Sequence, residues 1–145
     1  MRIPISAPRL ALVSACALIL AAGGALSASD KTKPSLSLKA SPPTGFAPTR
    51  VVLTAELKGG VNDYEEFYCP SVEWVWGDDT KAESKIDCEP YEAGKSEIKR
   101  RYVFDRTFQE SGNFRVEFRL KQKNKVVGSA STTVNIRPGI RDGGN

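Results

Sequence analysis

The chain contains no histidine and only three cysteines, and these shortages argue against several kinds of chemistry. Histidine is the side chain whose ordinary pKa suits a base near neutral pH. Structural zinc is usually held by sets of four cysteine and histidine ligands, and a cysteine nucleophile needs a free thiol beside an activating base. We therefore expect no zinc site, no cofactor and no enzyme activity.

Carboxylates placed across a cleft are also lacking. The clearest acidic pair, Asp78 and Asp79, is adjacent in the sequence, whereas glycoside hydrolysis needs two carboxyl groups about 5–9 Å apart on either side of the substrate. The same pair is a candidate calcium site, but calcium takes about six to eight oxygen ligands. We favour a turn that is capped by its own side chains.

Positive charge is only slightly in excess, at +4. Binding of nucleic acid normally needs a concentrated basic patch, so we expect no nucleic-acid partner. Basic residues in the second half could gather into a patch for an anionic glycan or a phospholipid headgroup. We favour outward positions paired across strands with Glu73, Glu97 and Glu117. These basic residues are Lys99, Arg100, Arg101, Arg106, Arg115, Arg119 and Lys121.

Long hydrophobic runs are scarce. Residues 10–22 form the one apolar run near the start, and it is shorter than the about 20 residues of a comfortable membrane span. Arg2 and Arg9 precede it and small residues follow it, which is the pattern of a secretory signal peptide. We expect residues 1–28 to be that signal, and its loss would lower the net charge to +2 because both arginines go. The mature chain would then be periplasmic, extracellular or at the cell surface, and not an integral membrane protein.

A lipid anchor is the alternative for the same segment. Residues 13–16 resemble a bacterial lipobox, in which Cys16 would be lipidated. The apolar segment ahead of Cys16 would then be short for a signal peptide, so we favour simple cleavage.

Cys69 and Cys88 are the cysteines that remain after cleavage, and export favours a disulfide between them. Their positions agree with this pairing. In a hairpin that turns at Asp78 and Asp79, the numbers of paired residues add up to 157, and those of Cys69 and Cys88 do so too. Opposed antiparallel residues lie within disulfide range. The bridge would lie outward, or Pro70 would mark a bulge that changes the facing of Cys69.

Alternating apolar residues predict strands along the whole mature chain, and no amphipathic helix or internal repeat appears. The organising strand carries Val72, Trp74 and Trp76 on one face and ends at Gly77 and Asp78, which are typical turn residues. Residues 50–57, 96–104, 114–120 and 126–136 show the same alternation. Residues 41–48 contain three prolines, which remove hydrogen-bond donors, so we expect no regular ladder there. Residues 64–69 are aromatic and acidic, a composition that fits either a loop or an edge strand.

This spacing predicts an all-β fold, a single immunoglobulin-like β-sandwich of about seven antiparallel strands preceded by the signal peptide. We expect a short polar leader at residues 29–35, the sandwich at residues 36–137 and a flexible tail at residues 138–145.

Four segments in this order resemble the polycystic-kidney-disease (PKD) domain, an immunoglobulin-like sandwich of exported and cell-surface proteins. They are residues 45–55 (G-x-x-P-x-x-V-x-L-x-A), 74–79 (W-V-W-G-D-D), 106–116 (R-T-F, then G-N-F-R-V) and 128–134. The chain departs from the family where Asp79 replaces a glycine and where Arg106 and Phe108 replace histidine and tyrosine. Residues 81–105 are longer than usual, and we expect features specific to this protein there.

Four aromatic residues near the Trp strand are candidate ligand-binding residues: Tyr64, Phe67, Tyr68 and Tyr91. They could form a sugar-binding platform, because aromatic side chains are enriched at recognition surfaces. In a sandwich they could equally close one end of the core.

The resemblance implies an exported, non-catalytic PKD-like module that mediates protein–protein or protein–carbohydrate interaction at the cell envelope or surface. The alternatives are a structural envelope component that assembles through its sheet edges and a calcium-binding spacer domain.

Overall fold

The computed structural model describes residues 32–140. The predicted signal peptide, the lipobox with Cys16 and most of the predicted tail lie outside these residues. Eight strands and one short 3₁₀ helix make up the described chain. They are β1 (Ser35–Ser41), β2 (Thr44–Phe46), β3 (Thr49–Lys58), η1 (Glu65–Phe67), β4 (Ser71–Val75), β5 (Lys81–Ser84), β6 (Arg101–Phe108), β7 (Gly112–Gln122) and β8 (Lys125–Arg137).

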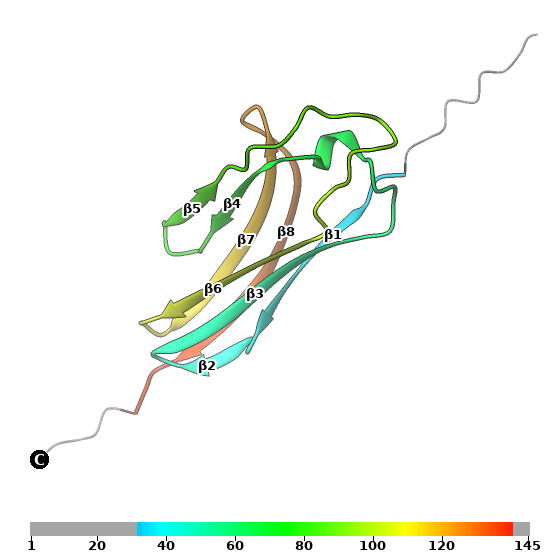
Figure 1. Cartoon of the computed structure of the whole chain (residues 1–145). Helices are drawn as coiled ribbons and strands as arrows, with labels where there is room; N and C mark the ends of the chain where they lie inside the picture. Colours follow the sequence, from blue (N-terminus) through cyan, green and yellow to red (C-terminus); the bar gives the residue numbers. More distant parts are fainter. Residues whose placement is uncertain (1–31, 141–145) are drawn as a thin grey trace, which may run out of the picture.

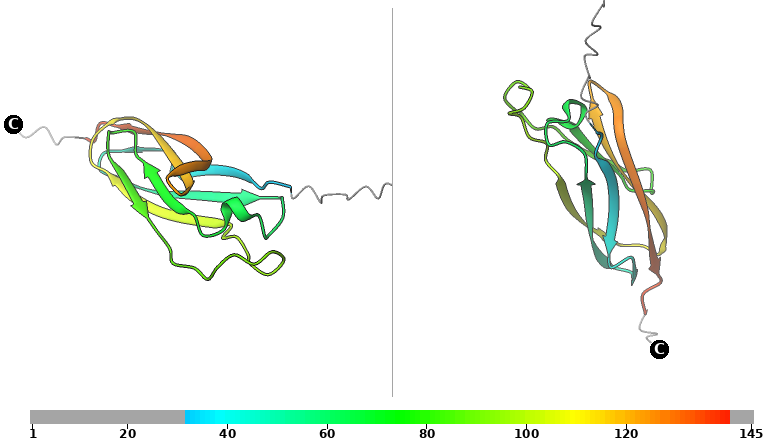
Figure 2. Two further views of the ribbon diagram at one scale, coloured as in Figure 1. Left: turned by 90° about the horizontal axis from the view of Figure 1, so that it is seen from above. Right: turned by 90° about the vertical axis from the view of Figure 1, so that its right-hand side faces the viewer.

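The strands form two facing sheets, so the predicted all-β sandwich is confirmed (Figure 1, Figure 2). One sheet has the order β1-β3-β6 and the other has the order β2-β8-β7-β4-β5. The first and last described residues lie at opposite ends of the long axis (Figure 1). Within the described residues, no helix has the length and hydropathy that a membrane span needs.

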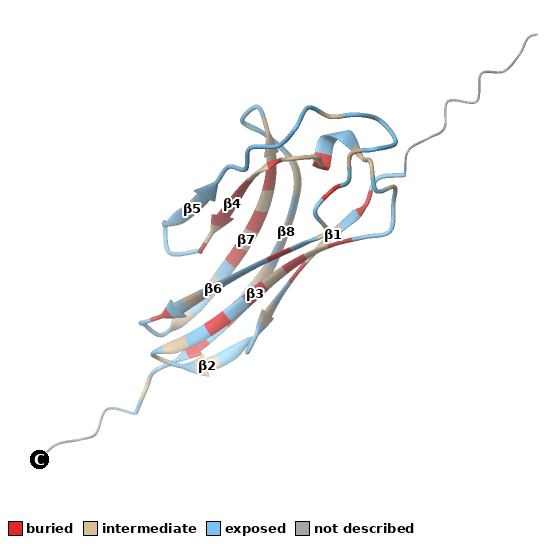
Figure 3. Cartoon of the chain, viewed as in Figure 1, coloured by how far each residue is buried: buried red, intermediate tan, exposed pale blue. Residues whose placement is uncertain are grey.

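The core lies between the sheets and follows the predicted alternation, as the buried residues on β3, β4 and β7 show in Figure 3. Trp74 and Trp76 are both buried, and their rings stack at a centroid distance of 5.9 Å. The other predicted inward residues that are buried are Val51, Leu53, Ala55, Leu57, Val72, Val116, Phe118, Leu120, Val134 and Ile136.

Two details of the strand prediction were wrong. Residues 41–48 were expected to hold no ladder, yet β2 pairs with β8, and it does so in parallel rather than antiparallel. Prolines lack a donor but keep their carbonyl, and the carbonyl of Pro43 accepts a hydrogen bond from the Asn135 amide at 2.9 Å. The strand expected over residues 96–104 begins only at Arg101. Ile98 precedes it and is buried, while Phe104 is 39% exposed.

The hairpin register differs from the prediction by one residue. Pairs between β4 and β5, such as Val72 with Ser84, have numbers that add up to 156. The Trp76 amide donates to the Thr80 carbonyl, so three residues form the loop instead of two. Gly77 and Asp79 adopt positive φ angles of 82° and 63° there, conformations that glycine and aspartate tolerate.

Candidate functional site

The cysteines lie beyond the ends of this hairpin and are nevertheless joined. Cys69 and Cys88 form a disulfide with Cα atoms 6.1 Å apart, although neither belongs to β4 or β5. Cys88 is exposed and Cys69 is half-buried, so the bridge lies toward the solvent. It ties the connection between β5 and β6 to the segment that enters β4.

The 3₁₀ helix η1 arranges three of the four predicted aromatic residues at this end of the sandwich. Phe67 is 1% exposed and anchors η1 in the core. Tyr64 is half-buried and packs edge-on against Phe67 at a centroid distance of 5.1 Å. We therefore leave Phe67 out of the proposed binding surface and assign Tyr64 to its support. Tyr68 directly follows η1 and lies at the surface end of the cluster.

Tyr68 and Tyr91 come together from segments far apart in the sequence. Their ring centroids are 5.6 Å apart, with the planes tilted by 58°. The Tyr68 hydroxyl donates to the Glu89 carbonyl at 2.7 Å, and the Tyr91 hydroxyl donates to the Asp63 carbonyl at 2.6 Å. Both rings are thus held in place by backbone acceptors, which fixes their orientation before any ligand arrives.

An open groove of about 690 Å³ lies beside these two rings. Its opposite wall is the turn between β7 and β8, where Lys123 and Asn124 have positive φ angles. The Gln122 side chain joins the walls, because its amide nitrogen donates to the Tyr68 carbonyl at 2.6 Å and to the Glu66 carbonyl at 3.2 Å. The lining residues are Glu65, Glu66, Tyr68, Cys69, Tyr91, Gln122, Lys123, Lys125 and Val127.

The groove offers aromatic rings and both signs of charge. Glu65 and Glu66 belong to η1, and Lys123 and Lys125 flank the β7–β8 turn. Its lining includes no serine, threonine or histidine, and its cysteine is bridged. Both carboxylates come from one helical turn rather than from two walls. Such a lining can bind a polar ligand by stacking and hydrogen bonds.

The predicted turn at Asp78 caps itself with its own side chain. The Asp78 carboxylate accepts hydrogen bonds from the Thr80 amide, at 3.1 Å, and from the Thr80 hydroxyl. It also pairs with Arg106. Burial would raise the pKa of Asp78, but the Thr80 hydrogen bonds and the Arg106 charge outweigh it and lower the pKa. Among residues 32–140, no group of three or more His, Cys, Asp and Glu side chains is placed to hold a metal ion.

Several of the basic residues are drawn into separate interactions rather than one patch. Arg100 donates to the carbonyls of Leu57 and Gly59, at 3.3 and 2.8 Å. Arg119 and Lys121 approach Glu73, whose side chain is only 4% exposed. Glu73 was expected to be a solvated outward residue. It is buried instead, because the long side chains of β5 and β7 fold over it.

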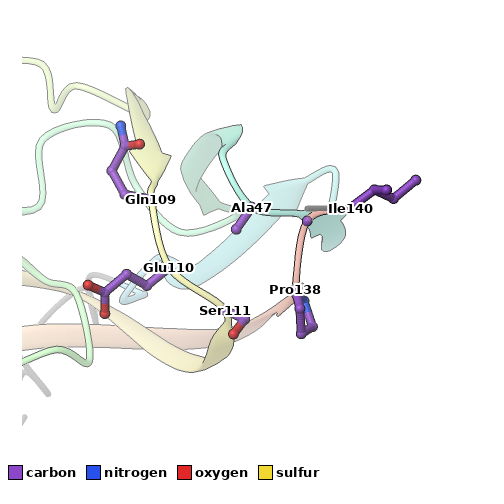
Figure 4. A pocket seen from close by; sticks show the side chains of 7 residues that line it. Ala47, Gln109, Glu110, Ser111, Pro138 and Ile140 are labelled. Atoms are coloured by element: carbon purple, nitrogen blue, oxygen red, sulfur yellow. The ribbon is translucent and has the colours of Figure 1, made fainter. Parts of the chain in front are cut away.

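A second pocket lies at the other end of the sandwich (Figure 4). It has about 460 Å³ between the β6–β7 turn, with Gln109, Glu110 and Ser111, and the segment with Pro138 and Ile140. It contains no aromatic side chain, and one wall consists of the last described residues. We base no function on it.

The comparisons with known proteins add a likeness in fold. No protein-family model matches the chain, and no curated protein matches it in sequence. Among solved structures it resembles the PKD domain of an M14-like peptidase from Thermoplasmatales archaeon SCGC AB-540-F20, with 14% identity and a TM-score of 0.45 over 73% of this chain and 97% of that one. A PKD domain is thus among the structures that this chain resembles, as the sequence motifs predict.

The CARDB domain of the PF1109 protein from Pyrococcus furiosus is also similar. Its crystal structure, in complex with di-metal ions, has 13% identity and a TM-score of 0.42 over 74% of this chain and 96% of that one. Its solution structure has 17% identity and a TM-score of 0.46 over 72% and 94%. These values carry no inference about ligands or activity for this chain.

Proposed function

We propose that this chain is a non-catalytic binding module of the cell envelope or cell surface, and that it binds a glycan in the groove beside Tyr68 and Tyr91. The observation that carries this proposal is the pairing of two tyrosine rings 5.6 Å apart along an open groove. Loops on a rigid sheet frame are the usual place for recognition in such folds.

The composition of the groove favours a glycan over a strongly charged ligand. Tyrosine rings offer flat apolar faces for a sugar ring, and carboxylates and ammonium groups can hydrogen-bond to its hydroxyls. The two glutamates and two lysines of the lining balance in formal charge. A polyanion would meet the carboxylates, and a polycation would meet the ammonium groups.

The disulfide supports an exported location. Disulfides persist in oxidising compartments and are rare in the cytosol. The Cys69–Cys88 bridge lies at the surface beside the groove, so it holds the site together where a reducing environment would open it. The predicted signal peptide leads to the same compartment.

The experiment is a binding titration of the mature, oxidised protein with soluble cell-wall oligosaccharides, followed by calorimetry. We expect saturable binding that weakens about fivefold in Tyr68→Ala, since loss of one stacked ring costs about 1 kcal/mol. Lys123→Gln and Lys125→Gln change the rim without touching the tyrosine hydrogen bonds and should weaken binding less. Phe46→Ala removes an exposed aromatic ring on β2, outside the lining, and is the matched control.

Absence of saturable binding to any cell-wall glycan would overturn the glycan assignment. A protein captured from envelope extract by the wild type, but not by Tyr68→Ala, would point to a protein partner for the same groove. Circular dichroism of each variant distinguishes a lost contact from a lost fold.

A further inference from the structure

The strand β6 forms an open edge of the three-stranded sheet. It pairs with β3 along one side, and within residues 32–140 no strand pairs along its other side. The Leu57 amide donates to the Arg100 carbonyl, and hydrogen-bonded pairs alternate along an antiparallel ladder. The backbone groups of Arg101, Val103, Asp105 and Thr107 therefore face outward from this edge.

The side chains along this edge are unusual for a protected one. Val103 is 56% exposed and Phe104 is 39% exposed. Natural sheets normally blunt a free edge with proline, charged side chains or a bulge. β6 contains no proline and no bulge, and its charged residues, Arg101, Asp105 and Arg106, carry both signs, so they can attract a second copy of the same edge. Arg101 and Asp105 carry opposite charges, and each lies two residues from Val103. Within the subunit Arg101 pairs with Glu56 at 3.9 Å and Asp105 pairs with Arg50 at 3.0 Å, but both side chains stay more than half exposed and can reach a partner subunit.

We propose that two copies of this chain pair through their β6 edges, antiparallel, with Val103 opposite Val103 of the partner subunit. In this register Arg101 lies opposite Asp105 of the partner subunit, and the two-fold symmetry repeats the contact. The residues that meet are those whose backbone groups face outward, so the ladder can form. The two sheets join into one continuous sheet of six strands.

Charge complementarity selects this register over its neighbours. A shift by one residue in each copy places Val103 opposite either Asp105 or Arg101, which loses the reciprocal Arg101–Asp105 pairs. In the second case Asp105 meets Lys99 instead, which lies before the start of β6 and so outside the strand. On the inner face, Tyr102 meets Phe104 of the partner subunit, an aromatic cross-strand pair. Arg100 and Arg106 also meet, but each already binds groups of its own subunit, namely the Gly59 carbonyl and Asp78.

The first experiment is disulfide trapping of the mature protein. In a hydrogen-bonded antiparallel pair the Cα atoms lie about 5.5 Å apart, within disulfide range. We expect Val103→Cys to form a covalent dimer under mild oxidation. Val52→Cys is the matched control, since Val52 is 37% exposed on β3, next to β6 and away from the edge. Equal cross-linking of the two variants would overturn the proposal.

The second experiment is charge exchange followed by sedimentation. Arg101→Glu and Asp105→Lys each place like charges opposite each other in a homodimer, so each should weaken dimerisation about tenfold or more. In an equimolar mixture of the two variants, opposite charges meet again, and we expect dimers to return. Each variant alone must show a cooperative melting transition, which demonstrates that it is folded.

A wild-type chain that stays monomeric at every concentration would overturn the proposal, as would a mixture that stays monomeric while both variants are folded. The inference is independent of the glycan groove, which is lined by η1 and the β7–β8 turn rather than by β6. Glycan affinity in the charge variants should stay unchanged.

Discussion

The guanidinium group of Arg106 lies 4.8 Å from the centre of the Trp76 ring while it pairs with Asp78 in the turn after the Trp strand. It also donates to the Thr80 hydroxyl at 3.0 Å. One cation on β6 thereby contacts the face of Trp76 and holds the β4–β5 loop through Asp78 and Thr80. Arg106 stands where the PKD pattern has histidine, and it links the two sheets by charge and by its position over the ring.

Replacement of Arg106 by alanine should destabilise the protein. A cation over an aromatic ring and a charge-assisted hydrogen bond are together expected to contribute about 1–3 kcal/mol. Chemical denaturation of Arg106→Ala would measure this loss. Arg50→Ala is the control, since its ion pair with Asp105 is mostly exposed and should contribute less than about 1 kcal/mol. Equal losses in both variants would contradict the role of Trp76.

Glu73 should make stability depend on pH. Hydrogen bonding from Lys81, together with Arg119 and the Lys121 charge, lowers its pKa below the ordinary 4.5 in spite of burial. A carboxylate with a lowered folded pKa adds stability above its unfolded pKa and loses it as pH falls through the folded value. Glu73→Gln should therefore lower the free energy of unfolding by about 1–3 kcal/mol at pH 7.

Denaturation of Glu73→Gln and wild type at several pH values would test this. The difference between them should shrink below the ordinary pKa of Glu73, while Glu83→Gln, the cross-strand neighbour with a more exposed carboxylate, should show little effect. A difference that persists in strong acid would mean that Glu73 acts through packing and not through charge.

The Tyr102 hydroxyl has no hydrogen-bond partner within the described residues, although it is buried. Burial raises the pKa of Tyr102 to about 12. Removal of an unsatisfied buried hydroxyl relieves its desolvation cost. Tyr102→Phe should therefore leave the free energy of unfolding unchanged or raise it by about 1 kcal/mol. Tyr91→Phe loses a 2.6 Å hydrogen bond and should be less stable. A clear loss in Tyr102→Phe would reveal a partner, such as an ordered water.

Removal of the disulfide should lower the free energy of unfolding by about 3 kcal/mol, because the unfolded chain is then no longer constrained by a bridge between residues 19 positions apart. Denaturation of the Cys69→Ser, Cys88→Ser double variant would measure it, and reductant should affect only the wild type. Glycan affinity should fall as well, because Cys69 lines the groove. An unchanged affinity would show that Tyr68 and Tyr91 hold the groove without the bridge.

Calcium should leave the melting temperature unchanged. The Asp78 carboxylate is occupied by Thr80 and Arg106, and Asp79 brings too few oxygens for a calcium site. Melting in millimolar calcium and in chelator would test this. A rise in melting temperature that disappears in Asp79→Asn would revive the calcium-binding spacer.

The sequence allowed the segments of the candidate groove to be recognised one by one, but not their arrangement in space. Tyr68, Tyr91 and the turn after Gln122 could each be recognised from residue type, but no pattern indicates that the β7–β8 turn lies against Tyr68. That contact depends on the Gln122 side chain, which reaches the Tyr68 and Glu66 carbonyls from 54 and 56 residues away. The burial of Glu73 was missed for a similar reason, since alternation predicts which side a residue faces but not what covers it.

The order of apolar and polar residues was enough to predict most of the core, because a strand has a period of two and burial favours the apolar set of side chains. The sequence also predicted that Cys69 and Cys88 would be the bridged pair, since no other thiols remain after the predicted cleavage. The hairpin register, the burial of Glu73 and the contact between Tyr68 and Tyr91 became visible only in the folded chain. Those depend on contacts between segments distant along the chain, which no local period encodes.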